Sequence, residues 1–196
     1  MMNAGPARAW GQQDRDADAA FRTPSTRVSF SPSDGSQPVT IRTATPADTS
    51  GILDCLLQAF APYREQYTPD GFADTVLSAE TMERRMRKMS LLVAVDEQGE
   101  VVGTVGWKLI GPDEGHLRGM TVRPDLLGSG IAQALLDAAE LAMRQHGGVR
   151  VTLGTTAPLA RAVRFYERNG YRRAGEARDF FGMALFEYVK VLASPR

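Results

Sequence analysis

Two glycines, Gly128 and Gly130, stand between a predicted strand and a predicted helix, which is the order typical of an anion-binding turn. The strand ends at Val122, and the glycines let the backbone approach a ligand closely. The helix from Ser129 onward begins with unpaired N–H groups, which attract phosphate through hydrogen bonds and the helix dipole. Residues 117–142 are therefore predicted to hold the diphosphate of a nucleotide cofactor. A Gly-x-Gly pair alone is weak support, because the same pair occurs in loops that simply turn.

A second segment, residues 162–171, follows one predicted strand later and makes the prediction more specific. It reads Ala-x-x-x-Tyr-x-x-x-Gly-Tyr, with Ala162, Tyr166 and Gly170 at its fixed positions. In this order and spacing the two segments resemble the acetyl-CoA-binding motifs of the GNAT family of N-acetyltransferases. The resemblance extends over about residues 39 to 192. It implies acetyl-CoA as cosubstrate and direct acetyl transfer to an amine of a small molecule or peptide.

The resemblance also implies roles for individual residues. The backbone at the end of the strand would pair with the pantetheine arm and supply an oxyanion donor, at Met120, Thr121 and Val122. The loop and the first helical turn would cradle the pyrophosphate, with Leu127, Gly128, Ser129, Gly130, Ile131 and Ala132. In the later helix Ala162 belongs to the cofactor site, and Tyr166 would stand near the cofactor sulfur.

Two positions depart from the family pattern. Leu127 occupies the place of the family's basic or amide residue before the first loop glycine, so one polar contact to the diphosphate is missing. Leu159 aligns with the family's usual Asn early in the later helix. Backbone N–H groups are therefore expected to carry most of the diphosphate binding.

Acetyl transfer needs a neutral amine and a leaving thiolate that is stabilised. An amine with a pKa of about 10.4 costs about 4.6 kcal/mol to deprotonate at pH 7, so a base or a water relay is expected. The interior of the strand at 117–120 has no carboxylate, which leaves Glu114 as the first candidate base, followed by His116 and Asp179. Each of these could equally be an ordinary surface residue, and our hypothesis is that water carries the proton. Tyr166 is predicted to donate a hydrogen bond to the departing thiolate.

The acceptor site is the least defined part of the prediction. In the resembled family it lies between the first two helices and the last hairpin. The corresponding residues here are Tyr63, Tyr67, Asp70, Phe72, Asp179, Phe180 and Phe181. These aromatic residues suit either a partly apolar pocket or core packing. Arg118 could meet an anionic group on the acceptor or face water, and the basic run at 84–88 is typical of a solvated face.

Two other functions compete with this interpretation. A nicotinamide-binding Rossmann domain would need a third glycine where Gln133 stands, and an acidic residue at the end of the strand at 149–153, which is absent. A catalytically weak acyl-CoA-binding or protein-interaction module on the same fold stays open, because a fold does not fix a function. The replacement by Leu127 slightly favours that module.

The elements that would position these residues alternate between strands and helices. Helices are predicted from Thr45 to about residue 61, at 79–89, 129–146 and 158–169, and the connection at 63–79 could contain further helix. Strands are predicted at 39–42, 91–95, 101–107, 116–123, 149–153, 171–175 and 182–192. This order indicates a mixed α/β fold. With the resemblance it implies a mostly antiparallel sheet of about seven strands flanked by four helices, with the fourth and fifth strands splayed apart.

Composition and chain ends set wider limits. Residues 1–38 are poor in apolar side chains and are predicted to be a disordered tail, or an arm that folds onto a partner, before an acetyltransferase domain at 39–196. Lys plus Arg equals Asp plus Glu, at 23 each, which argues against a strongly cationic nucleic-acid binder. The single cysteine, Cys55, excludes an internal disulfide and makes a Cys-based metal site implausible, so it is expected to fill space. No apolar run suits a membrane span or a signal peptide, so a cytoplasmic protein is expected, and a homodimer is allowed.

Overall fold

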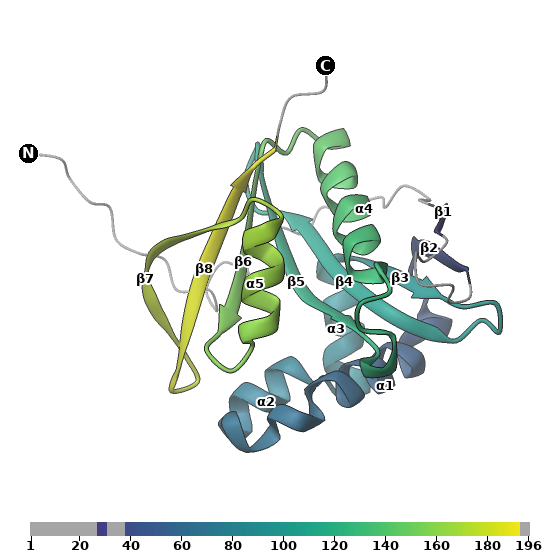
Figure 1. Ribbon diagram of the computed structural model, residues 1–196, viewed down its shortest axis with the longest axis horizontal. Coiled ribbons are helices and arrows are strands. Elements are labelled where there is room, and N and C mark those ends of the chain that lie inside the picture. Colours follow the sequence, from purple (N-terminus) through teal and green to yellow (C-terminus); the bar gives the residue numbers. More distant parts are fainter. Residues whose placement is uncertain (1–26, 31–37, 193–196) are drawn as a thin grey trace, which may run out of the picture.

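The computed structural model describes residues 27–30 and 38–192, and within them eight strands form one sheet (Figure 1). In spatial order the strands are β1 (Arg27–Phe30), β2 (Val39–Thr43), β3 (Ser90–Val95), β4 (Val101–Leu109), β5 (Glu114–Val122), β6 (Arg150–Thr156), β8 (Met183–Val191) and β7 (Arg172–Phe180). Every neighbouring pair is antiparallel except β5 and β6, which are parallel. A parallel pair needs a crossover, and α4 supplies it.

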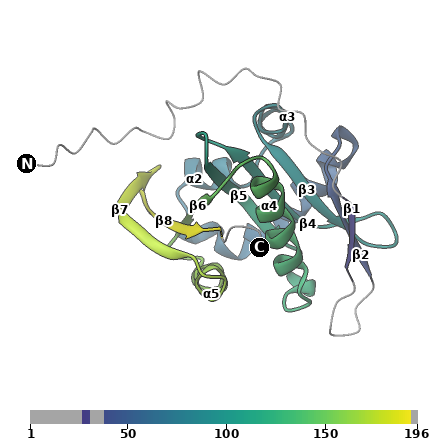
Figure 2. The same ribbon diagram turned by 90° about the horizontal axis from the view of Figure 1, so that it is seen from above.

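Helices cover both faces of this sheet (Figure 2). They are α1 (Thr49–Phe60), α2 (Pro69–Thr75), α3 (Ala79–Lys88), α4 (Ile131–Gln145) and α5 (Ala160–Arg168), with short 3-10 segments at Pro46–Asp48, Ala61–Gln66 and Pro124–Leu126. Figure 2 shows α4 and α5 on one face, while α2 and α3 lie on the other. Helix starts are fixed by side chains: Thr68 Oγ1 accepts from the N–H of Gly71 at 3.2 Å, and Ser78 Oγ accepts from that of Thr81 at 3.3 Å.

The core is divided between the two faces of the sheet. On one face, Ile131, Leu135 and Ala139 of α4 recur every fourth residue and pack against the strands. On the other face, α1 buries Ile52 together with Cys55. Burial raises the pKa of the Cys55 thiol to about 12, so this side chain stays protonated and packs as a small apolar group.

The parallel pair separates partway along its length. Backbone pairing between β5 and β6 runs only from Glu114 and Arg150 to Leu117 and Leu153, although β5 continues to Val122. The β6-facing edge of β5 therefore has unpaired backbone groups beyond Leu117. Such groups need a partner from water or a ligand.

A bulge in β5 lies in this separated part. The register between β4 and β5 shifts between Thr104 and Gly106, which pair with Thr121 and Arg118. Gly119 has a φ of 62°, a left-handed conformation that side chains disfavour. The bulge redirects β5 just before Met120.

These observations confirm the predicted fold class and the splayed strand pair. The structure adds α2 within the connection that the sequence left open, so five helices rather than four are present in the described residues. The predicted tail differs at Arg27–Phe30, which form β1 on the edge of the sheet, because a strand pairs through its backbone whatever its composition. The rest of that tail lies outside the described residues. No helix that the structure describes is long and apolar enough to span a membrane.

Candidate active site

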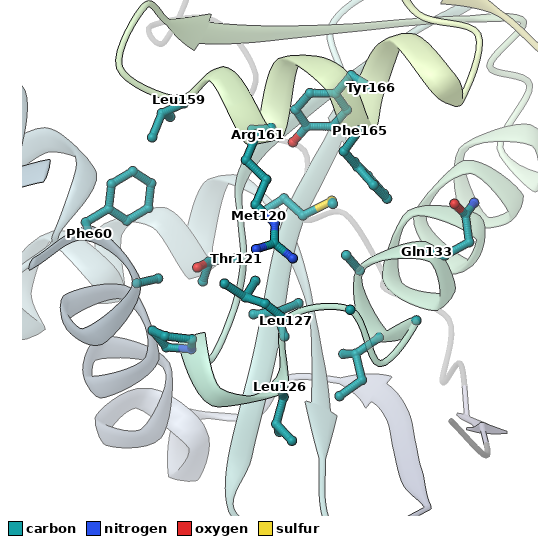
Figure 3. Close-up of a pocket in the computed structure, with 18 of the residues that line it drawn as sticks. Phe60, Met120, Thr121, Leu126, Leu127, Gln133, Leu159, Arg161, Phe165 and Tyr166 are labelled. Atoms are coloured by element: carbon teal, nitrogen blue, oxygen red, sulfur yellow. The ribbon is translucent and has the colours of Figure 1, made fainter. Parts of the chain in front are cut away.

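A cleft with a volume of about 500 Å³ opens between the separated part of β5, the start of α4 and the side of α5 (Figure 3). Ten of the predicted cofactor residues line it: Met120, Thr121, Val122, Leu127, Gly128, Gly130, Ile131, Ala132, Ala162 and Tyr166. They come from β5, from the turn and first residues of α4 that follow it, and from α5, which is separated from them by β6. The topology thus brings both predicted motifs to one cleft.

The glycine turn has the geometry of an anion cradle. Gly128 and Gly130 have φ values of 101° and 91°, so both positions favour glycine. The first N–H groups of α4 have no partner within the helix and sit at the cleft. Ser129 is the exception among the predicted residues, because it is buried, does not line the cleft, and donates its hydroxyl to the carbonyl of Leu126 at 2.7 Å. Its side chain holds the turn together and does not face a ligand.

Arg161 is a lining residue that was not predicted from the sequence. Its side chain points from the first turn of α5 into the cleft, toward the wall that carries Leu127 (Figure 3). A guanidinium binds phosphate well, so Arg161 can offer a cation from the opposite wall. The spacing of Arg161, Phe165 and Arg168, all of which line the cleft, is four and three residues and marks one helix face. This spacing in the sequence could have predicted that Arg161 lies on the face of the helix that carries Phe165.

Tyr166 lines the cleft from α5. Its ring packs edge-on against Tyr171, with centroids 5.6 Å apart. Burial raises the pKa of the Tyr166 hydroxyl well above its usual value, so the group stays a neutral donor. Within the described residues this hydroxyl has no hydrogen-bond partner, which leaves it available to a ligand.

A second cavity, with a volume of about 170 Å³, adjoins the first. The two share five lining residues, Phe60, Met120, Leu159, Ala162 and Tyr166. Its charged lining residues are Asp74, Arg85 and Arg118, and Arg118 forms an ion pair with the Asp74 carboxylate. Burial, and then the nearby charge of Arg118, lower the pKa of Arg85 to about 10, so Arg85 remains a cation at neutral pH.

Two of the three candidate bases, Glu114 and Asp179, lie outside both cavities. Glu114 lies at the start of β5, 3.6 Å from Arg150 in an ion pair, and lines neither cavity, so the structure does not bring this predicted catalytic residue to the site. The reason is register: Glu114 precedes the point at which β5 and β6 separate. Asp179 is also outside both cavities and caps the last hairpin by accepting from the N–H of Gly182 at 3.1 Å.

His116 does line the second cavity, but it is a poor base. Its Nδ1 lies 3.0 Å from Thr152 Oγ1 in a buried hydrogen bond. Burial, followed by the charges of Arg118 and Lys108, lowers the pKa of His116 to about 3. The ring is therefore neutral at physiological pH and has little tendency to take up a proton.

The predicted acceptor residues divide between pocket and core. Tyr67 and Phe180 line the second cavity, and the Tyr67 hydroxyl lies 2.6 Å from Thr156 Oγ1 across the gap between the helices and β6. Tyr63 lines the first cleft. Phe72 packs edge-on against Tyr67 in the core, at a centroid distance of 6.3 Å. Asp70 and Phe181 are exposed and line neither cavity.

Comparison with known proteins agrees with this geometry. The sequence profile of the family described as "Acetyltransferase (GNAT) family" matches residues 54–171, which is more than half of the chain. The chain therefore belongs to the GNAT acetyltransferase family. The match covers the glycine turn and the segment around Tyr166.

Individual relatives extend the comparison. The chain is 36% identical over 104 residues to a mycothiol acetyltransferase of Propionibacterium freudenreichii, covering 48% of this chain and 33% of the relative. It is 41% identical over 85 residues to an N-acetylaspartate synthetase of Danio rerio, covering 42% and 30%. This chain thus matches only about a third of the length of these curated relatives. The solved structure of the PaiA N-acetyltransferase of Thermoplasma acidophilum in complex with coenzyme A has a TM-score of 0.64 at 18% identity, covering 76% of this chain and 97% of that one, which shows the shared fold.

Proposed function

We propose that this chain transfers an acetyl group directly from acetyl-CoA to an amine of a small molecule or peptide. The observation that carries this proposal is the meeting of two cavities at Met120 and Tyr166, where β5 has separated from β6. One cavity can hold a long cosubstrate and the other a small acceptor. The two substrates would then meet at a point that both walls reach, which suits a reaction without a covalent enzyme intermediate.

The successive parts of acetyl-CoA can be placed one after another along the first cleft. Its diphosphate would sit at the start of α4, near Gly130 and Ala132, where helix N–H groups and the dipole favour negative charge. Arg161 would supply a positive charge from α5, in place of the polar side chain that Leu127 lacks. The pantetheine arm would pair with backbone groups of β5 that β6 leaves unpaired, near Met120.

At the meeting point the thioester carbonyl would accept a hydrogen bond from the backbone of β5. A backbone donor of this kind stabilises the oxyanion that forms when the amine attacks the carbonyl carbon. The new C–N bond forms, the C–S bond breaks, and coenzyme A leaves as a thiolate. Tyr166 would donate a hydrogen bond to that sulfur; full proton transfer from a phenol to a thiolate is uphill by roughly 2 kcal/mol on ordinary pKa values, so the proton is finally supplied by solvent.

The amine must lose a proton. No carboxylate of the described residues except Asp74 lines either cavity, and Asp74 is paired with Arg118. We therefore retain water as the proton carrier, with bulk solvent as the final acceptor. The rate should then increase with pH as more of the amine becomes neutral.

A catalytically weak acyl-CoA-binding module is the second candidate. It is favoured by Leu127 beside the diphosphate site and by the absence of an unpaired carboxylate among the described residues at the cavities. Release of coenzyme A from acetyl-CoA, measured with a thiol reagent over a panel of amines, separates the two functions. Amine-dependent release supports the transferase, whereas tight binding of coenzyme A without any amine-dependent release supports the binding module.

A further inference from the structure

The second cavity contains a partly buried cation, Arg85, that has no ion-pair partner of its own among the described residues. Arg85 Nη2 donates to the backbone carbonyl of Asp74 at 3.2 Å, which uses one of the five N–H donors of a guanidinium. In the described part of the chain no carboxylate lies within ion-pair distance of Arg85. The nearby Asp74 carboxylate acts on Arg85 through its charge, but its ion pair is with Arg118. Partial burial of a cation without an ion pair of its own is unfavourable, so a ligand anion would be favoured here.

The net charge of the second cavity also favours a ligand anion. Its charged walls carry two guanidinium groups, Arg85 and Arg118, against one carboxylate, Asp74. His116 is neutral at physiological pH, and Tyr67 and Tyr166 are neutral because burial raises the pKa of each hydroxyl. The cavity is therefore positive by one charge, which repels a polycationic acceptor and attracts an anionic one.

Arg85 is also close to the reacting end of β5. A Cβ added at Gly119 would lie 3.1 Å from Arg85 Nη1, so the guanidinium rests directly against the bulge. Met120, which both cavities share, is the next residue. An anion held by Arg85 must therefore belong to the acceptor close to its reacting amine.

Resting on the proposed transferase function, we propose that the acceptor is a free amino acid or a similar small molecule with a carboxylate beside its amine, and that Arg85 binds this carboxylate. The volume of about 170 Å³ suits a small molecule of this kind. A protein N-terminus has no carboxylate next to its amine, and a polyamine carries the wrong charge. Arg118, paired with Asp74, lines the same cavity.

The test compares amino acids with their carboxamides as acceptors. The two have nearly the same shape, and the amine of the carboxamide is the weaker base, so chemistry alone favours the carboxamide at neutral pH. We expect the protein to prefer the amino acid by at least about tenfold in kcat/KM, the size of one charge-assisted hydrogen bond. Equal or better use of the carboxamide would overturn the proposal.

Substitutions of two neighbouring arginines in α3 test whether Arg85 causes this preference. Arg85→Gln should reduce the preference for the acid by about tenfold, mainly through the KM of the acid, and Arg85→Lys should restore part of it. Arg84→Gln is the matched control, because Arg84 is an exposed neighbour that lines neither cavity, and it should leave the preference unchanged. An unchanged preference in Arg85→Gln would contradict the proposal; if that variant does not fold, the wild-type ratio and Arg85→Lys decide.

Failure of the transferase function itself gives a different result. In that case no acceptor is acetylated, and thermal unfolding with amino acid or carboxamide present becomes the readout. Stabilisation by the amino acid but not the carboxamide, lost in Arg85→Gln, would retain the carboxylate site without catalysis. Equal stabilisation by both compounds, or by neither, would remove it.

Discussion

At the scale of single residues, Tyr166 has the clearest chemical assignment. Its hydroxyl is neutral, lies at the junction of the two cavities and has no partner among the described residues. Tyr166→Phe removes one hydrogen bond to the leaving sulfur, so kcat should fall by about tenfold or more while the KM for acetyl-CoA changes less. Steady-state kinetics measure this. Tyr188→Phe, in a buried tyrosine that lines neither cavity, is the control, and equal turnover in Tyr166→Phe would exclude the role.

Arg161 allows a second prediction at the residue scale. If its guanidinium compensates for Leu127, Arg161→Gln should weaken coenzyme A binding by about fivefold, a modest loss because the side chain is exposed. Binding of pantetheine, which lacks the nucleotide phosphates, should hardly change. Calorimetric titration with both ligands measures the difference. Arg164→Gln, on the same helix but away from the cleft, should bind both normally, and an equal loss for both ligands in Arg161→Gln would contradict the assignment.

At the scale of elements, the bulge in β5 is the feature that shapes the site. Gly119→Ala places a Cβ at a φ of 62° and 3.1 Å from Arg85 Nη1, so it should destabilise the fold by about 1–2 kcal/mol. Activity should fall as well, because the bulge positions Met120. Chemical denaturation gives the stability. Gly111→Ala is the matched control, since its φ is ordinary and its nearest neighbour is 3.9 Å away, and similar losses in both variants would show that the bulge has no special role.

The elements also show what the sequence could and could not predict. The glycine turn and the segment around Tyr166 were predictable because each is a local pattern within one strand–helix or helix–strand unit. The second cavity was not, because its charged residues come from α2, α3 and β5 and meet only after folding. Arg85 is the clearest example: in the sequence it belongs to a basic run, and its neighbours Arg84, Arg87 and Lys88 are indeed exposed, while packing against Gly119 turns Arg85 alone inward.

At the scale of the whole molecule, His116 couples stability to pH. Its folded pKa of about 3 lies below the unfolded value of 6.5, so the neutral ring contributes stability above pH 6.5 that is lost as the pH falls toward 3. The slope should be largest between about pH 5.5 and about pH 4, where the unfolded ring is protonated and the folded ring is not, and the free energy of unfolding should fall there by about 1.4 kcal/mol per pH unit. Denaturation at several pH values measures this slope.

The chain has two histidines, so the effect of replacing His116 on this pH dependence can be compared with the effect of replacing His146. His116→Gln should remove most of it, whereas His146→Gln, at the end of α4 and outside both cavities, should preserve it. A slope that persists in His116→Gln would assign it to other groups.

We propose that acetyl-CoA lies in the cleft between the separated strands, and a crystal structure of the protein with coenzyme A tests this placement most directly. We expect the diphosphate at the N–H groups of Gly130 to Gln133, with Arg161 beside it. The sulfur should lie within hydrogen-bond distance of the Tyr166 hydroxyl, where the cleft adjoins the cavity of Arg85. Coenzyme A bound elsewhere, or with its sulfur directed away from Tyr166, would contradict it.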